Sequence, residues 1–154
     1  MKNIYNKTKY YSTNTNLLLL ILFPLFISST QTFAIDSQQQ KKIVLQLTDN
    51  SPQKQTLILN VADNLLKQYG KSVELEIVAF GPGLQLLFNE NQHNQRVSKL
   101  AKSGVKFSAC RNTAKKMENM LGKDLKLHEF ANETSGGAAR IIELVEQGYI
   151  LIRP

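Results

Sequence analysis

The chain has 154 residues, of which 42% are hydrophobic and 20% charged, with one Cys, two His and a formal net charge of +7. This composition is typical of a single folded domain and not of a disordered chain. One Cys excludes an intramolecular disulfide framework and a zinc site of paired cysteines, and with only two His we expect no metal site and no cofactor.

Residues 1–34 have the features of a secretory signal peptide. Met1–Asn16 is polar and carries three lysines but no acidic residue, and Leu17–Ile27 is an apolar run of eleven residues. Thr32 and Ala34 place small residues at the −3 and −1 positions of a cleavage site. A transmembrane helix needs about 20 apolar residues, so this run favours cleavage after Ala34 and a periplasmic location. An uncleaved N-terminal anchor is the alternative.

Removal of this segment changes the charge of the protein. Cleavage leaves 120 residues and removes three lysines and no acidic residue, which lowers the formal net charge from +7 to +4. Neither a Lys/Arg-rich block nor an Arg–aromatic pattern remains, so we do not expect nucleic-acid binding. Because cleavage also removes the apolar run, we expect no stable membrane span in the mature protein.

The mature chain alternates strands and helices after a polar tether over residues 35–42. Its hydrophobic periodicity predicts five strands, at residues 43–48, 73–80, 105–110, 125–130 and 149–152. Between them it predicts helices at 52–70, 84–88 (short), 94–103 and 113–121, and a last helix that ends at Gly148. We expect Ser51 and Asn112 to cap their helices. Ala138, Ile141, Ile142 and Val145 form the predicted buried stripe of the last helix.

This order predicts a three-layer α/β domain over residues 43–154, with a mostly parallel five-stranded sheet and helices on both faces. Loops that follow parallel strands meet at the carboxyl edge of the sheet, where open α/β folds bind ligands. We therefore expect one site at this edge, made of Cys110 with Asn50, Ser51, Gly81, Gly83, Arg111 and Asn112.

Cys110 is the candidate reactive residue, because it lies where a strand meets a helix N-terminus. Unpaired N–H groups there favour an anion, and Arg111, Lys115 and Lys116 are predicted to add an electropositive pocket for a thiolate or persulfide. The alternative is that Cys110 is a small buried hydrophobic residue with solvated basic neighbours. No His or acidic residue adjoins it, so a Cys–His protease is not supported.

Several other features are expected to be structural. Gly81-Pro82-Gly83 lacks the spacing of a phosphate-binding loop and is predicted to be a tight turn that passes close to the Cys110 loop. His93 and His128 are expected to be structural or solvated, and residues 135–137 are interpreted as the loop that starts the last helix.

Three segments together resemble the DsrE/DsrF-like family: VAFGPGLQLLF at 78–88, SGVKFSACRNT at 103–113 and EQGYILIRP at 146–154. The opening IVLQLTDNSPQKQTLILNVADNLL at 43–66 fits the family's first strand and helix. The resemblance implies a flavodoxin-like fold assembled as a homo-oligomer, either a trimer or a hexamer. It also implies that Cys110 carries persulfide sulfur to or from a donor or acceptor protein. The well-understood carriers are cytoplasmic, whereas this chain carries a predicted export signal.

Three functions are consistent with the sequence. The first, which we favour, is an exported sulfur carrier, at most sulfurtransferase-like, that holds a persulfide on Cys110 and passes the sulfur to a partner. The second is a non-enzymatic oligomeric module that binds a small anion. The third is a thiol-redox-responsive protein joined between subunits through Cys110.

Overall fold

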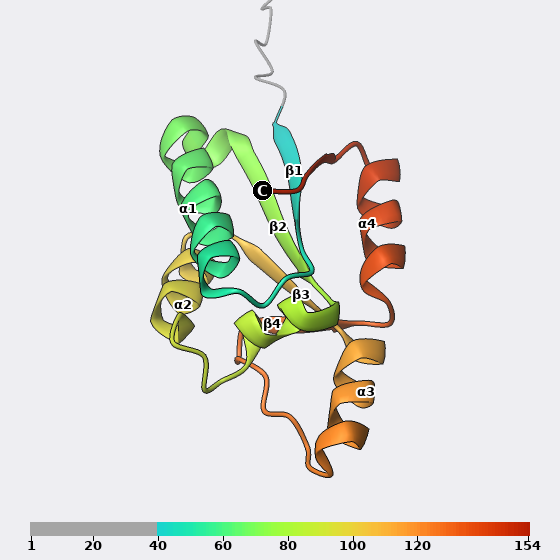
Figure 1. Cartoon of the computed structure of the whole chain (residues 1–154). Coiled ribbons are helices and arrows are strands. Elements are labelled where there is room, and N and C mark those ends of the chain that lie inside the picture. The colour runs from blue at the N-terminus through green and yellow to red at the C-terminus, as the bar shows by residue number, and fades with distance from the viewer. Residues whose placement is uncertain (1–39) are drawn as a thin grey trace, which may run out of the picture. The chain divides into compact units, whose positions relative to one another are not determined.

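Apolar strands and amphipathic helices alternate along residues 40–154, which are the residues that the structure, a computed structural model, describes (Figure 1). The predicted signal peptide and most of the predicted tether lie outside them. The elements are β1 (Lys41–Leu47), α1 (Pro52–Tyr69), η2 (Gly70–Ser72), β2 (Val73–Ala79), η3 (Gly81–Leu87), α2 (Asn94–Lys102), β3 (Lys106–Cys110), α3 (Arg111–Leu121), β4 (Ala131–Thr134), α4 (Gly137–Glu146) and β5 (Ile150–Ile152).

The five strands form one parallel sheet in the order β4-β3-β2-β1-β5. The predicted α/β domain with a flavodoxin-like parallel sheet is therefore confirmed. Leu47 is opposite Ala79, and Ala79 is opposite Ala109. The carboxyl ends of β1, β2 and β3 thus lie side by side, and the segments that follow them leave from one edge of the sheet.

Each face of the sheet packs against different helices, because alternate side chains of a strand point to opposite faces. One face packs against α1, α2 and η3, with Leu45, Ile77 and Phe107 fully buried in this larger core. The other face packs against α4, through Val44 and Val78 on the sheet and Ile141, Leu144 and Tyr149. Figure 1 shows α3 extending beyond the carboxyl edge instead of covering a face.

The fourth strand is not where the sequence predicted it. Residues 125–130 do not join the sheet: Leu127 forms an isolated antiparallel bridge with Phe88, and the His128 N–H donates to the Leu87 carbonyl at 2.8 Å. The strand is instead the polar segment Ala131–Thr134. A polar strand is tolerated there because β4 is an edge strand, and Asn132 and Glu133 are exposed.

Two further expectations need correction. β1 begins at Lys41, two residues inside the predicted tether, because Lys41 and Lys42 pair with the start of β2. In α4 the buried stripe consists of Gly137, Ile141 and Leu144, whereas Ile142 and Val145 are 59% and 46% exposed. The helix is therefore rotated from its predicted orientation. Within residues 40–154 no helix is both long and apolar enough to span a bilayer.

Candidate functional site at the carboxyl edge

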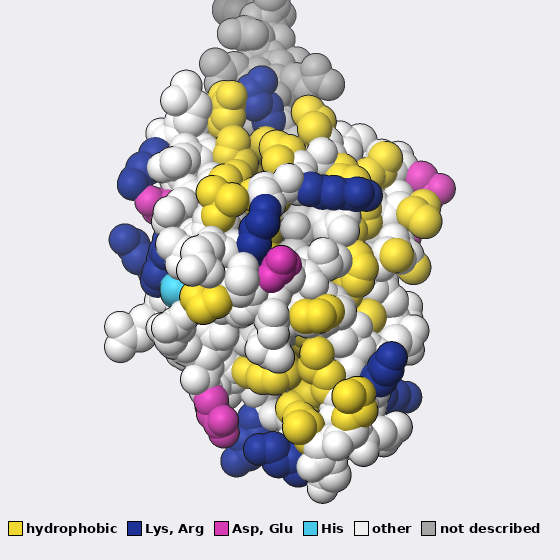
Figure 2. All heavy atoms as spheres, in the orientation of Figure 1, with side chains coloured by type: hydrophobic (Ala, Val, Ile, Leu, Met, Phe, Trp, Pro, Cys, Tyr) yellow, Lys and Arg dark blue, Asp and Glu magenta, His cyan; other side chains and the backbone are white. Residues whose placement is uncertain are grey.

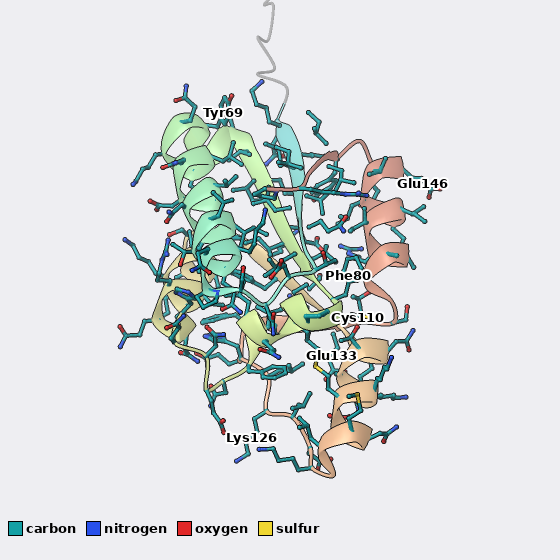
Figure 3. All side chains as sticks on the ribbon, in the orientation of Figure 1. Tyr69, Phe80, Cys110, Lys126, Glu133 and Glu146 are labelled. Atoms are coloured by element: carbon teal, nitrogen blue, oxygen red, sulfur yellow. The ribbon has the colours of Figure 1, made fainter. Side chains whose placement is uncertain are left out.

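Hydrogen bonds connect the segments that leave the carboxyl edge of the sheet. The Gly81 N–H donates to Thr113 Oγ1 at 3.1 Å, which joins the end of β2 to the start of α3. The Asn112 N–H donates to the Ser135 carbonyl at 3.4 Å, which joins α3 to the loop before α4. Figure 3 shows Phe80, Cys110 and Glu133 at this end of the sheet, opposite the end that Tyr69 and Glu146 mark.

Cys110 is both the last residue of β3 and the N-cap of α3, so the chain passes directly from strand to helix. The predicted cap, Asn112, is instead the second residue of the helix. The helix begins earlier than predicted because no loop separates β3 from α3. Cys110 is only 5% exposed.

The surroundings of Cys110 favour its thiolate. Burial of the thiol raises the pKa, but hydrogen bonds from the Thr113 hydroxyl and from the backbone N–H groups of Thr113, Gly137 and Asn112 lower it, and the net effect is a pKa below the ordinary value of a cysteine. Cys110 makes no side-chain capping hydrogen bond of regular geometry. These donors therefore act chiefly by stabilising the charged form.

The donors belong to the first turns of two helices. Asn112 and Thr113 lie in the first turn of α3, and Gly137 is the first residue of α4. N–H groups in a first helical turn have no partner within the helix, so those of Thr113 and Gly137 can donate to an anion, while the Asn112 N–H is shared with the Ser135 carbonyl. Two such turns at one sulfur provide more donors than either helix would alone.

The predicted electropositive pocket has a different arrangement. The Arg111 guanidinium lies 3.4 Å from Glu118 and 3.3 Å from Glu133, so its charge is already paired. Lys115 is exposed to solvent. Backbone dipoles and a hydroxyl, and not these cations, are the groups that lower the pKa of Cys110.

Thr113 and Gly137 are functional candidates that the sequence analysis missed. Thr113 Oγ1 accepts the Gly81 N–H, which leaves its own proton free to be donated to the sulfur. At Gly137, an added Cβ would lie 2.5 Å from Cδ1 of Phe80, so only glycine lets the start of α4 approach this closely. The signal for Thr113 was present in the sequence as a hydroxyl three residues after the cysteine, in the first turn of the helix.

Three other predicted site residues, Asn50, Ser51 and Gly83, have partners outside the junction of β3 and α3. Ser51 is the helix cap that was predicted, since its Oγ accepts the Lys54 N–H at 3.3 Å. Asn50 Nδ2 donates to Gln85 Oε1 at 3.4 Å. Gly83 does allow a close backbone approach, but to the end of β1 and not to the Cys110 loop: an added Cβ would lie 2.5 Å from the Leu47 carbonyl oxygen.

A cavity of about 680 Å³ lies between η3 and α3. Its walls are mainly apolar, as Figure 2 shows over these two elements in the lower part of the view. The apolar lining residues are Phe80, Pro82, Phe88, Met117, Met120 and Leu121, and the polar lining side chains are Gln85, Asn112, Thr113 and Lys116. Asn112 and Thr113 thus border both the cavity and the Cys110 sulfur.

The two histidines lie away from Cys110. His128 is 4% exposed, with Nε2 at 3.0 Å from Ser98 Oγ and Nδ1 accepting the Phe130 N–H at 3.1 Å. Its role is structural, in agreement with the prediction. His93 is half-buried, and burial lowers its pKa. Among residues 40–154 no group of three His, Cys, Asp or Glu is placed to hold a metal ion.

No family model matches the chain, and no curated protein matches it. Among solved structures it is similar to MTH1491, a protein of unknown function from Methanobacterium thermoautotrophicum, with a TM-score of 0.67 and 28% sequence identity. The match covers 74% of this chain and 99% of that chain. This similarity supports the fold, and it assigns no reaction because the function of MTH1491 is unknown.

Proposed function

We propose that this protein is an exported member of the DsrE/DsrF-like family that carries sulfane sulfur as a persulfide on Cys110 and passes it to a partner. The observation that carries the proposal is the set of donors from α3 and α4 around one thiol, which lowers its pKa. The thiolate is the nucleophilic form of cysteine, and a persulfide anion in the same place would use the same donors.

The transfer is balanced without an external oxidant. The Cys110 thiolate attacks the outer sulfur of a donor persulfide, R–S–SH. A new S–S bond forms on Cys110 as the donor's S–S bond breaks, and the donor leaves as the thiolate R–S⁻. With thiosulfate as donor, the leaving group is sulfite. An acceptor thiolate then removes the outer sulfur in the same way and regenerates Cys110.

The burial of Cys110 disfavours a stable disulfide between subunits, and sulfur exchange with a partner protein also requires Cys110 to become accessible. A disulfide requires two sulfurs at about 2.05 Å and two Cβ atoms at about 3.8 Å. With 5% of its surface exposed, Cys110 cannot meet its counterpart in a second copy unless the covering segments move. The same burial shields a persulfide from unwanted thiols in an oxidising compartment.

Intact mass spectrometry tests the proposal. Protein purified from the periplasm is expected to begin at Ile35, and incubation with thiosulfate or polysulfide is expected to add about one sulfur mass. The matched control is Cys110→Ser, which should gain nothing. Absence of the added mass, or its persistence in Cys110→Ser, would refute the proposed carrier role.

We also propose that the protein forms a homo-oligomer, as the family resemblance implies, through the outer face of α4. Ile142 and Val145 are 59% and 46% exposed on this face. Beside it, Glu146 and Arg153 border a hollow of about 400 Å³. Opposite charges beside an exposed apolar face can pair across a contact between two copies, which favours a second copy as the occupant.

A further inference from the structure

We propose that the cavity between η3 and α3 binds a small organic thiol or persulfide with an apolar body, and that this compound exchanges sulfur with Cys110. This inference rests on the proposed carrier function and names the class of its substrate. It differs from a relay in which a partner protein's cysteine meets Cys110 directly.

The size and lining of the cavity fit a small molecule. Its volume of about 680 Å³ lies within the range of about 300–1,000 Å³ that is usual for ligand sites. Two aromatic rings, Phe80 and Phe88, lie in its wall together with Met117 and Met120. Methionine side chains adapt to irregular apolar shapes and make favourable contacts with aromatic rings, so this lining suits an aromatic or branched aliphatic body.

One charged side chain in the lining indicates the charge of the ligand. Lys116 is the only ionic residue among those that line the cavity, and within residues 40–154 its side chain makes no ion pair or hydrogen bond. Arg111, its basic neighbour on α3, is paired with Glu118 and Glu133. A ligand that becomes an anion would therefore find an uncommitted cation in the cavity wall, and the thiolate released by sulfur transfer is such an anion.

The cavity and the buried sulfur share a boundary. Asn112 and Thr113 line the cavity, and both donate to the Cys110 thiolate. Because Cys110 is only 5% exposed, a compact reagent in the adjoining cavity has a shorter approach than a cysteine on the surface of a folded partner. Cys110 itself is not among the lining residues, so the proposed exchange requires Asn112 and Thr113 to move aside.

The proposed step conserves atoms and electrons. In loading, the Cys110 thiolate attacks the outer sulfur of the bound R–S–SH, and the R–S⁻ that leaves is stabilised by Lys116. In unloading, a bound R–S⁻ attacks the outer sulfur of the Cys110 persulfide, forming R–S–SH and restoring the thiolate. The sulfane sulfur keeps its oxidation state in both directions.

The test uses the mature protein loaded on Cys110 with polysulfide and then unloaded by one of two thiols. Phenylethanethiol and 2-mercaptoethanol are compared at equal thiolate concentration, and loss of the sulfur mass is followed over time. Phenylethanethiol is expected to unload the protein about tenfold faster, with a rate that saturates, because only its phenyl ring gains from burial in the cavity. Equal rates that rise linearly with both thiols would overturn the inference.

Two variants locate the effect. Met120→Lys changes a cavity residue that is 76% exposed, so the fold should tolerate it, and it should reduce the rate ratio of the two thiols by several-fold. Lys116→Gln should slow loading by phenylethyl persulfide by several-fold. The matched control is Leu57→Lys, an exposed apolar residue on α1 that lies outside the cavity and should leave the ratio unchanged.

The outcomes separate this inference from the function on which it rests. If polysulfide adds no sulfur to Cys110, both fail. If Cys110 is loaded but the two thiols unload it equally, the carrier stands and the small-molecule site is refuted. A change in the assembly's mass on Met120→Lys without a change in the rate ratio would show that a second copy covers the cavity, which also refutes the site.

Discussion

At the scale of single residues, Thr113 connects the glycine loop after β2 to the reactive thiol. Its Oγ1 accepts the Gly81 N–H at 3.1 Å, and its own proton is available to the Cys110 sulfur. A hydroxyl that already accepts one hydrogen bond is held in orientation and donates more effectively to an anion. The GPG segment therefore acts on the thiol through Thr113.

Replacing this hydroxyl should make Cys110 less reactive at neutral pH. Thr113→Val keeps the shape of the side chain but removes the donor, so the pKa of the thiol should rise and less thiolate should be present. Because a hydrogen bond to a charged group contributes about 1.5–3 kcal/mol, the rate of alkylation at pH 7 should fall about tenfold.

The measurement is the pH dependence of Cys110 alkylation by iodoacetamide, followed by intact mass. The wild-type midpoint should lie below that of free cysteine, and that of Thr113→Val should lie above the wild-type midpoint, with the same limiting rate at high pH. Thr113→Ser keeps the hydroxyl and should resemble the wild type. Superimposed profiles of wild type and Thr113→Val would contradict this role.

Part of this site was accessible from the sequence, because it depends on where strands end. Cys110 was located by the strand-to-helix junction alone. The sequence did not locate Gly137, because this residue follows Cys110 by 27 positions and its N–H comes close to the sulfur only in the folded chain. The strand before Gly137 was also predicted at the wrong residues, 125–130 instead of 131–134. Arg111 was misread for a similar reason: Glu133, one of its two partners, is close only after β4 pairs with β3.

At the scale of elements, the start of α4 is fixed by the contact between Gly137 and Phe80. An added Cβ on Gly137 would lie 2.5–2.6 Å from three atoms of the Phe80 side chain. Gly137→Ala should therefore displace the helix start, lower the free energy of unfolding by about 1–3 kcal/mol and slow Cys110 alkylation. Urea denaturation and the alkylation assay measure the two effects.

Gly136→Ala is the matched control for this substitution. A Cβ at Gly136 would meet nothing closer than Ala139 Cβ at 3.7 Å, and the backbone there is extended with φ of −146°. Since Gly136 is the N-cap of α4, where alanine is less favourable than glycine, stability should fall by no more than about 1 kcal/mol and the alkylation rate should match that of the wild type. If the two alanine variants behave alike, the contact with Phe80 does not position α4.

A buried ion pair attaches α4 to the sheet. Glu76 on β2 is 1% exposed, and Arg140 holds it with Nε–Oε1 and Nη2–Oε2 distances of 2.8 and 2.9 Å, while Ser108 Oγ donates to Oε1 at 2.6 Å. Arg140→Leu would leave the carboxylate buried without its cation, and should cost about 3 kcal/mol of unfolding free energy.

Glu143→Gln is the control for this ion pair, because it alters the exposed partner of Arg140 and leaves Glu76 intact. The Glu143 side chain is 54% exposed, so its loss should change stability by less than about 1 kcal/mol in urea denaturation. Equal effects of Arg140→Leu and Glu143→Gln would mean that the buried pair does not anchor α4.

The sequence predicted well those elements in which the apolar residues are the ones that become buried in the fold. α1 satisfies this condition, with its cap at Ser51 and its end at Gly70. β4 does not, because an edge strand with an open face needs few apolar residues, while Leu125 and Leu127 pack against the larger core without entering the sheet. α4 carries apolar residues on more of its surface than the sheet covers, so periodicity alone could not orient it.

At the scale of the whole molecule, that excess of apolar surface lies on the outer face of α4. Ile142 and Val145 are exposed, whereas Ile141 and Leu144 fill the contact with the sheet. Solvent exposure of these side chains costs free energy that a second copy would recover by covering them. The rotation of α4 away from its predicted orientation thus supports an interface on its outer face.

Ile142→Lys should weaken this assembly, because it places a charge among apolar side chains that a second copy would bury. In sedimentation equilibrium the wild type is expected to be oligomeric, and the variant should dissociate at concentrations at least about tenfold higher than the wild type does.

Leu57→Lys, which introduces the same charge at an exposed apolar position on α1, should leave the mass unchanged. A monomeric wild type would show that no such assembly forms. Equal dissociation of the two variants would show that the interface does not lie on the outer face of α4. Ile142 lies five positions beyond Gly137, the α4 residue whose N–H acts on Cys110, so alkylation of the variant should proceed at the wild-type rate, which separates assembly from thiol chemistry.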